Sequence, residues 1–538
     1  MKKAKRIPAL VAGATALGLI ASGCGSSGGD EGGDSDAPIT ARSIEPQNPI
    51  IPTSTNEVGG GNIVDELWAG LVSYSPEGET QMEVAESIES EDNVNWTVKL
   101  EDGWEFSDGT PVTADSFVDA WNYGADPENA QLGAYFFEPI KGTTDDGTFK
   151  KGAEGISGLE VKDDSTFTIE LKSPASDFAD RLGYSSYFPL PESAFEDMDA
   201  FGEKPIGNGP YTLESWDHDV EAQLKTNPDY DGNRKPKNGG ITFKFYTDPE
   251  AAYTDVQSGV LNVSDEIPPS ALSTFEEDES IQAINKPGPI NTTVTIPDSL
   301  EHFGDDKEGK LRRQAISRAI DRKTITEQIF EGTHEPAVDF SSPAMPDASE
   351  DVPGNEVLEF DADEAKKLWA EADKINKFEG KFELGFNADG AGNTEWVEAV
   401  TNQVRKNLDI KAEPKPIATF AEFRELITSR KIGSAFRTGW QPDYPSAFSY
   451  LASVFGTGAG SNDGDYSNKK FDDAIREAAA AEGKKRNEGM TKAQAVLFED
   501  LPAIPLWTRN SYGAASADTS GFEFTWQNKP AYHLIVKN

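Results

Sequence analysis

The stretch WTVKLEDGWEFSDGTPVTADSFVDAW, Trp96 to Trp121, contains a strand, a turn and a helix in one continuous run. WTVKL is a short β-rich run, and the residues after it include the glycine, aspartate and proline that are common in turns. Thr113 can then cap a helix, because Phe117, Ala120 and Trp121 fall on one face at i, i+3 and i+4 spacing. A strand that leads directly into a helix predicts a mixed α/β fold.

The same alternation continues on both sides of this stretch. Further β-rich runs occur at Thr166 to Leu171 and Ile241 to Tyr246, and helical patterns follow candidate caps at Asp361 and Ser467. The chain has 538 residues, more than the ~250 to 300 at which one hydrophobic core stops growing. Since no composition break resembles a domain linker, we expect two or more lobes that are interleaved or tightly joined.

The charge balance of the chain is strongly acidic. It has 94 acidic and 49 basic residues, which gives a formal net charge of -45 at pH 7. Because this charge repels phosphate backbones, nucleic acid is not expected as a partner. We interpret the acidity as a solvating surface that keeps an exported protein monomeric, and its field would also gather cationic ligands.

The N-terminus has the order of an export signal. It begins with four basic residues, Lys2, Lys3, Lys5 and Arg6. An apolar stretch from Ile7 to Ile20 follows, which is too short to span a bilayer. The small residues Ala21-Ser22-Gly23 then precede Cys24, the only cysteine. We therefore predict a signal peptide over residues 1–23. The junction resembles a bacterial lipobox, with Ala21 in place of the commoner leucine, which implies that Cys24 is lipidated. Residues 24–38 are expected to form a flexible tether, so membrane attachment would depend on the lipid alone.

The residues give no positive evidence for an enzyme. A single cysteine excludes paired-thiol redox and cysteine-rich zinc sites, and the four histidines (His218, His302, His334 and His533) lack a metal-ligand spacing. The segment GYSSY, Gly183 to Tyr187, lacks the second glycine of a nucleophile elbow. Carboxylate pairs are unavoidable among 94 acidic residues, so they do not indicate a hydrolase. We expect no catalytic residue, no metal and no cofactor.

Several other segments follow one another in the order found in a family of binding proteins. Besides Trp96 to Trp121, they are Gly70 to Glu89, PIGNGPYTL from Pro205, NPDYDG from Asn227, Ala251 to Val263, Arg312 to Ile325, GWQPDYP from Gly439, Asp465 to Ala478 and LPAIPLW from Leu501. Together they resemble the extracytoplasmic solute-binding proteins of ABC importers, in the large oligopeptide/dipeptide-binding family. The resemblance covers nearly all of the mature chain, which makes it more specific than any one motif.

This resemblance implies a two-lobed periplasmic-binding-protein-like α/β fold with a two-strand hinge and an extra small domain on the first lobe. Lobe 1 would be assembled from three separate parts of the chain, residues 39–78, 201–286 and 508–538. The small domain would be inserted at residues 79–200, and lobe 2 would span residues 287–507. Such interleaving would explain why the composition shows no linker.

The resemblance also implies a ligand site within TGWQPDYPSAFSYL, Thr438 to Leu451. In peptide-binding members the aspartate of this segment holds the α-amino group of the ligand, and Asp443 falls on that position. The other implied ligand contacts are Gly439, Trp440 and Gln441 as an edge for an extended peptide, Arg437 for a peptide carboxylate, and Thr53 and Ser54 in a segment expected opposite. From the residues alone, Asp443 could instead stabilise a turn, Arg437 could be an exposed strand charge, and Trp440 could pack at the hinge.

The function implied by the resemblance is that of a lipid-anchored receptor on the outer face of the cytoplasmic membrane. It would capture short peptides between its lobes and deliver them to an ABC permease with its ATPase subunits. Relatives bind nickel complexes, haem or sugars, so a receptor for a sugar, a metal chelate or haem remains an alternative, and a secreted hydrolase is less favoured. Asp443 together with Arg437 suits a zwitterion.

Overall fold

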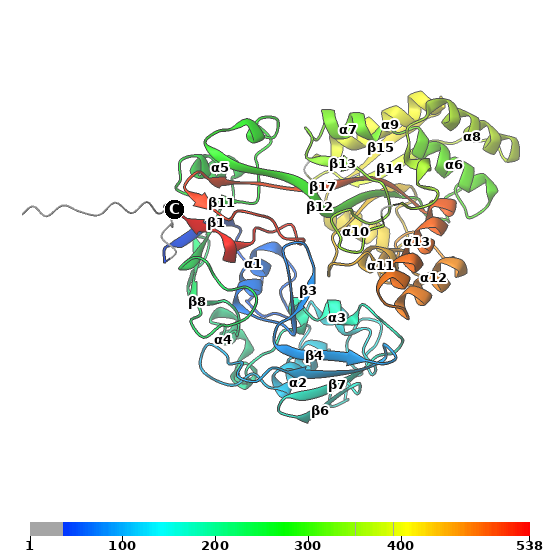
Figure 1. Ribbon diagram of the computed structural model, residues 1–538. Coiled ribbons are helices and arrows are strands. Elements are labelled where there is room, and N and C mark those ends of the chain that lie inside the picture. Colours follow the sequence, from blue (N-terminus) through cyan, green and yellow to red (C-terminus); the bar gives the residue numbers. More distant parts are fainter. Residues whose placement is uncertain (1–35, 350, 391) are drawn as a thin grey trace, which may run out of the picture.

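The structure, a computed structural model, describes residues 36–349, 351–390 and 392–538. The predicted signal peptide, Cys24 and most of the predicted tether lie outside the described residues. Figure 1 shows two large lobes joined by two long strands, with a smaller domain below the first lobe. One sheet runs through both lobes in the order β15-β14-β16-β12-β17-β11-β1-β10-β9-β8, and β13 pairs with β17.

Lobe 1 is built from segments that lie far apart in the sequence. It contains β1 (Pro38–Ser43), α1 (Val58–Leu67), β2 (Val72–Tyr74), β3 (Thr80–Met82), β8 (Tyr211–Asp217), β9 (Glu221–Thr226), β10 (Gly240–Phe245), α5 (Pro249–Gln257), β11 (Val263–Ser264), β18 (Thr519–Ser520) and β19 (Val536–Lys537). The small domain contains β4 (Ala85–Ser90), β5 (Asn95–Leu100), α2 (Ala114–Ala125), β6 (Leu159–Asp163), β7 (Thr166–Glu170), α3 (Phe178–Arg181) and α4 (Met198–Glu203).

Lobe 2 carries most of the helices. It contains α6 (Lys307–Arg318), α7 (Arg322–Gln328), β13 (His334–Pro336), α8 (Ala362–Ile375), β14 (Phe382–Asn387), α9 (Asn393–Leu408), β15 (Ala412–Ile417), α10 (Phe420–Thr428), β16 (Ala435–Trp440), α11 (Phe448–Phe455), α12 (Lys469–Ala479) and α13 (Gly483–Asp500). Short 3-10 helices occur at Ala134–Phe137, Ser185–Tyr187, Glu192–Glu196, Phe275–Glu277, Asn355–Leu358 and Tyr532–Leu534.

The predicted strand, turn and helix form as β5 and α2. Thr113 caps α2 in a reciprocal arrangement with Ser116, and the backbone N–H of Thr113 donates to the Ser116 hydroxyl at 3.1 Å. Phe117 and Trp121 are fully buried, so the apolar face of this helix packs into the core as its spacing predicts. Asp361 also caps its helix, α8, where its carboxylate accepts hydrogen bonds from two backbone N–H groups.

The predicted cap at Ser467 is wrong by one residue. The side chain of Asn468 caps α12 and accepts a hydrogen bond from the backbone N–H of Lys470 at 2.8 Å. The Ser467 hydroxyl is instead 3.1 Å from the Thr457 hydroxyl, which donates to it. The helix therefore begins one residue later than predicted, and Asn468 occupies the cap position.

The hydrophobic core is continuous between lobe 1 and the small domain. Ile39, Trp121 and Ile241 belong to one cluster, whereas lobe 2 has a separate cluster that includes Trp396 and Trp507. Because packed cores resist internal deformation, lobe 1 and the small domain should move as one body relative to lobe 2.

Two long antiparallel strands connect the lobes, β12 (Ile281–Thr295) and β17 (Ala503–Ser516). Their register shifts between Lys286 and Ile290, and irregularities of this kind locally bend a ladder. A Cβ atom at Gly288 would lie 2.5 Å from the carbonyl oxygen of Arg509, so the close approach of the strands requires glycine there. The predicted boundaries at 286/287 and 507/508 fall inside these two strands, and the domain limits remain a prediction.

Candidate ligand-binding cleft

Strand β16 has an unpaired edge in lobe 2. On one side it pairs with β12 from Phe436 to Trp440, whereas on the other side it pairs with β14 only at Ala435 and Phe436. From Arg437 to Trp440, this second edge has no strand partner among the described residues. Such an edge presents backbone N–H and C=O groups that can pair with an added strand.

Asp443 lies in the loop that follows β16. Burial raises the pKa of its carboxyl to about 6, and Arg181 opposes that rise. Its backbone N–H donates to the Ser449 hydroxyl at 3.1 Å. Within residues 36–349, 351–390 and 392–538, no donor forms a hydrogen bond with the carboxylate itself, so this side chain does not stabilise a turn here. A desolvated carboxylate without a donor is costly unless a cation or a donor meets it.

An aromatic group from the small domain faces Asp443. The rings of Tyr135 and Phe136 are 4.4 Å apart, and those of Phe136 and Tyr184 are 3.9 Å apart and stacked. Burial raises the pKa of both tyrosines, and the Asp443 carboxylate raises it further. Tyr135 is 50% exposed, although large apolar and aromatic side chains are usually buried. Asp443 of lobe 2 and this aromatic group of the small domain are therefore close enough for the carboxylate to act on both tyrosines.

Sequence reasoning missed this aromatic group. The segment GYSSY drew notice only as an incomplete hydrolase motif, although it contains Tyr184. The signal that could have found the group is the density of aromatic residues in two short segments, AYFF at Ala134–Phe137 and GYSSY at Gly183 to Tyr187. Their common position opposite Asp443 depends on how the lobes pack, which spacing does not show.

The three predicted residues before Asp443 have different surroundings. Trp440 is partly buried, donates from Nε1 to the Ser449 hydroxyl at 3.2 Å, and packs against a cluster formed by Met345, Tyr450 and Trp526. Gly439 and Gln441 are exposed. The Gln441 amide donates to the carbonyl oxygen of Gln527 in lobe 1 at 3.4 Å, so this residue spans the cleft.

Arg437 lies at the start of the unpaired β16 edge, and its side chain is held by neighbouring residues. Its Nε atom donates to the side-chain oxygen of Asn387 at 2.7 Å, and its guanidinium lies 5.8 Å from the Phe420 ring centre and 5.5 Å from that of Phe423. Burial lowers its pKa, the Asp389 carboxylate opposes this, and Arg424 lowers it further. Among the described residues no acceptor forms a hydrogen bond with Nη1. Arg437 is thus a partly buried cation rather than an exposed strand charge.

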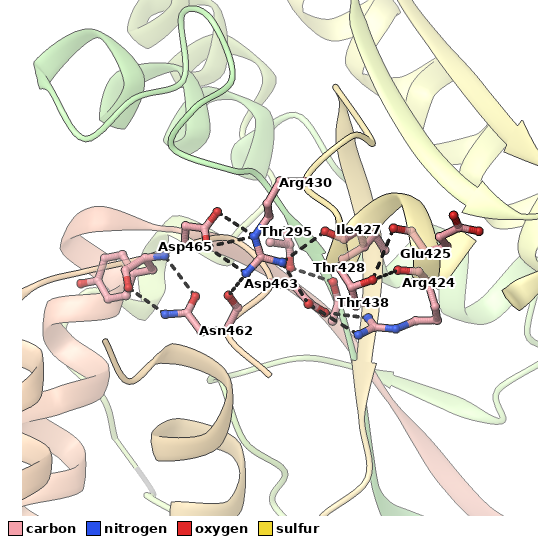
Figure 2. A network of polar contacts seen from close by, with 11 residues as sticks. Thr295, Arg424, Glu425, Ile427, Thr428, Arg430, Thr438, Asn462, Asp463 and Asp465 are labelled. Carbon is pink, nitrogen blue, oxygen red and sulfur yellow. Dashed lines mark hydrogen bonds and ion pairs between the residues drawn. The ribbon is translucent and has the colours of Figure 1, made fainter. Parts of the chain in front are cut away.

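Two other arginines nearby are neutralised by aspartates (Figure 2). Arg424 pairs with Asp463 at 2.6 Å, and Arg430 pairs with Asp465 at 2.8 Å. Arg437 has no carboxylate within ion-pair distance in the described part of the chain. Of these three arginines, Arg437 is therefore the one that can pair with an anionic group of a ligand.

Thr53 and Ser54, the two ligand contacts predicted in lobe 1, differ in burial and in hydrogen bonding. Thr53 is fully buried, and its hydroxyl donates to the Gln131 side chain at 2.9 Å while its carbonyl accepts from the Gly133 N–H at 2.8 Å. These bonds join lobe 1 to the small domain, and a ligand contact at Thr53 stays a prediction. Ser54 is partly buried, and its N–H donates to the Ile51 carbonyl at 2.9 Å.

Metal-binding groups and membrane-spanning helices are both absent from the described residues. In the parts of the chain that the structure describes, no group of three or more His, Cys, Asp or Glu side chains is placed to hold a metal ion. None of the helices in those parts is both long and apolar enough to cross a membrane.

Comparisons with known proteins identify relatives along almost the whole chain. The sequence family described as bacterial extracellular solute-binding proteins, family 5 Middle, matches residues 79–462. The oligopeptide-binding protein OppA of Bacillus subtilis (strain 168) is 25% identical over 516 residues, which cover 91% of this chain and 92% of the relative. The periplasmic oligopeptide-binding protein OppA of Haemophilus influenzae is 26% identical over 516 residues, which cover 92% of this chain and 91% of the relative.

Solved structures confirm the predicted fold class. The unliganded open form of MppA, a periplasmic murein tripeptide binding protein, superposes with a TM-score of 0.80 at 21% identity, covering 94% of this chain and 98% of the other. The two-lobed α/β architecture with a two-strand connection is therefore shared with solved binding proteins.

Proposed function

This chain belongs to the bacterial extracellular solute-binding proteins of family 5, and we propose that it captures short peptides between its lobes by their free α-amino group. Members of this family are binding proteins and not enzymes, so the cleft recognises a solute without transforming it. The names of the two OppA relatives support peptides as the solute class.

The observation that carries the proposal is the state of the Asp443 carboxylate. It is desolvated enough to raise its pKa to about 6, yet no donor among the described residues meets it. An α-ammonium group would supply the missing hydrogen bonds and add to the positive charge that Arg181 already provides. Such a charge-assisted hydrogen bond contributes about 1.5 to 3 kcal/mol net.

Two neighbouring features suit the rest of a peptide. The unpaired edge of β16 beyond Phe436 can accept an extended backbone as an added strand, which binds without reading side chains. Arg437 supplies an uncompensated cation at the start of that edge, where a peptide carboxylate could pair with it in a bidentate manner. The residues thus offer partners for both ends of a zwitterion.

Native mass spectrometry of the purified protein tests the solute class directly. We expect co-purified short peptides in the wild type, and their loss from an Asp443→Ala variant that still unfolds cooperatively. A co-purified sugar, haem or metal chelate would overturn the peptide assignment and leave the family membership standing.

We further infer that the protein is a monomeric, lipid-anchored receptor on the outer face of the cytoplasmic membrane and delivers its ligand to an ABC permease and its ATPase subunits. The support is the lipobox-like junction before Cys24 and the glycine- and serine-rich segment after it. Cys24→Ser should release the protein into the medium. Stable recovery of that variant in the membrane fraction would show that another attachment holds it.

A further inference from the structure

A polar cavity lies in lobe 1 between α1 and the C-terminal segment. Its volume is about 70 Å³, and its lining includes Asn62, Asp65, Glu66, Arg234, Tyr532 and His533. Since about 10 to 15 Å³ of such volume is enough to hold one water, the space is large enough for a small polar side-chain group.

Several side chains of this cavity are buried without a hydrogen-bond partner. Glu66 is 7% exposed, and Asn62 and Tyr532 are each 2% exposed. The atoms without a partner among the described residues are Glu66 Oε2, Asn62 Oδ1, the Tyr532 hydroxyl and Arg234 Nε. Buried polar atoms in folded proteins are almost always paired, so four such atoms around one cavity indicate a missing group that both donates and accepts.

The charges around the cavity nearly cancel. The carboxylate of Asp65 pairs with the Lys529 ammonium at 2.5 Å. Burial raises the pKa of Glu66 to about 7, Arg234 and Lys529 lower it and Asp65 raises it, so Glu66 is protonated in part at neutral pH. Burial lowers the pKa of His533 to about 3, which leaves that imidazole neutral. A guest with a full charge would gain little here, whereas a neutral group could pair with either form of Glu66.

Other residues of the lining connect the cavity to the surroundings of Trp440. They are Tyr74, Gly183, Trp526 and Gln527. Trp526 packs in the cluster that Trp440 joins, and the Gln527 carbonyl accepts the hydrogen bond from Gln441. Gly183 directly precedes Tyr184, one of the tyrosines that face Asp443. The cavity is therefore adjacent to the place where the α-amino group would bind.

We propose that this cavity is a side-chain pocket for the first or second residue of the bound peptide and selects a small uncharged side chain that both donates and accepts hydrogen bonds, such as that of asparagine. The proposal rests on the proposed function, because it needs a peptide anchored at Asp443. It adds a preference that the backbone contacts along β16 cannot supply.

Calorimetry with four tripeptides tests this pocket: Asn-Ala-Ala, Ala-Asn-Ala, Leu-Ala-Ala and Ala-Leu-Ala. Asparagine and leucine are close in size, so they differ mainly in hydrogen bonding. We expect the asparagine peptide to bind about tenfold more tightly at one of the two positions, as for one or two net hydrogen bonds. Glu66→Leu should abolish that ratio, and Glu66→Gln, which keeps a donor and an acceptor, should preserve most of it.

Glu308→Gln is the matched control, because Glu308 is a glutamate of lobe 2 that is 6% exposed, and it should leave the ratio unchanged. Thermal unfolding checks that each variant folds, and Asn62→Leu replaces Glu66→Leu if the latter does not. Equal affinities at both positions in the wild type, or an unchanged ratio in the folded leucine variant, would overturn the pocket while peptide capture stands. If none of the four peptides binds the wild type, the proposed function fails together with the pocket.

Discussion

At the scale of single residues, Asp443 should behave as an electrostatic anchor rather than a structural aspartate. Asp443→Ala would leave the ligand ammonium desolvated and unpaired, which should cost ~2 to 5 kcal/mol of binding free energy. That is a loss of tens to thousands of fold in affinity. Calorimetry with one short peptide on the wild type and the variant measures it.

N-acetylation of the same peptide separates the two roles of Asp443. Acetylation removes the ammonium, so it should weaken binding to the wild type by a similar factor and affect Asp443→Ala much less. A structural aspartate would also weaken binding when replaced, but the acetylation penalty would then be the same in both proteins. Equal penalties would therefore remove Asp443 from the site.

Peptide affinity should also depend on pH through Asp443. With a pKa of about 6 in the unliganded protein, the carboxylate is charged at pH 8 and becomes neutral as the pH falls below 6. A free α-amino group has a pKa of roughly 7.7 to 8.0, so it stays protonated below about pH 7, and affinity should fall by up to about tenfold per pH unit below pH 6. Asp443→Asn should bind more weakly at pH 7 and lose most of this pH dependence, as measured by calorimetry between pH 5 and 7.

The same pKa has the opposite effect on the stability of the unliganded protein. A carboxyl whose pKa is raised on folding, here from 3.8 to about 6, destabilises the folded state when it is ionised. This contribution is present above pH 6 and is relieved as the pH falls toward 4. Relative to Asp443→Asn, the unliganded wild type should therefore gain stability as the pH falls from 6 toward 4 while its affinity for peptide falls, so acid unfolding cannot explain both differences.

At the scale of elements, the unpaired edge of β16 should bind peptide backbone. N-methylation of one peptide amide removes a donor, and a lost ladder hydrogen bond should reduce affinity by roughly two- to tenfold. Successive amides of a strand point to opposite edges, so methylation of successive positions should give strong and weak effects in turn. A uniform effect along the peptide would contradict strand addition to the edge between Arg437 and Trp440.

Helix α2 shows what sequence could predict at this scale. Its cap, Thr113, and its buried face, Phe117 and Trp121, lie within nine residues of one another, so local chemistry is sufficient. The cap of α12 was misplaced because Ser467 and Asn468 are both good caps. The Ser467 hydroxyl accepts a hydrogen bond from Thr457 instead, a contact outside the local pattern.

The sequence predicted only those residues of the candidate site that lie in one continuous segment. Arg437 to Asp443 lie close together along the chain, so the resemblance could place them. Thr53 was expected in the cleft from its position in the chain, which gives proximity but not the direction of a side chain, and its hydroxyl binds Gln131. The group formed by Tyr135, Phe136 and Tyr184 comes from the inserted domain, so it required the packing of the lobes.

At the scale of the whole molecule, two of the contacts that join lobe 2 to the rest of the protein lie outside the cleft. One is the pair of long strands β12 and β17 (Figure 1). The other joins the small domain to the α12–α13 region, where Ser176 N–H donates to the Ala479 carbonyl at 2.8 Å and Asp180 pairs with Arg486 at 3.1 Å. The hydrophobic core of lobe 1 and the small domain is separate from that of lobe 2, as expected for two bodies joined by a hinge.

The contact between Asp180 and Arg486 should therefore help to set the distance between the lobes. Small-angle scattering of the wild type should show a smaller radius of gyration with a peptide mixture than without it. Arg486→Ala removes a partly buried ion pair between the lobes, so the unliganded variant should be more extended and bind peptide several-fold more weakly, because fewer molecules are in the binding-competent form. Arg476→Ala is the control, since Arg476 pairs only with Asp473 of its own helix. An unchanged radius of gyration in the wild type despite measured binding would exclude closure of the lobes as the mechanism of capture.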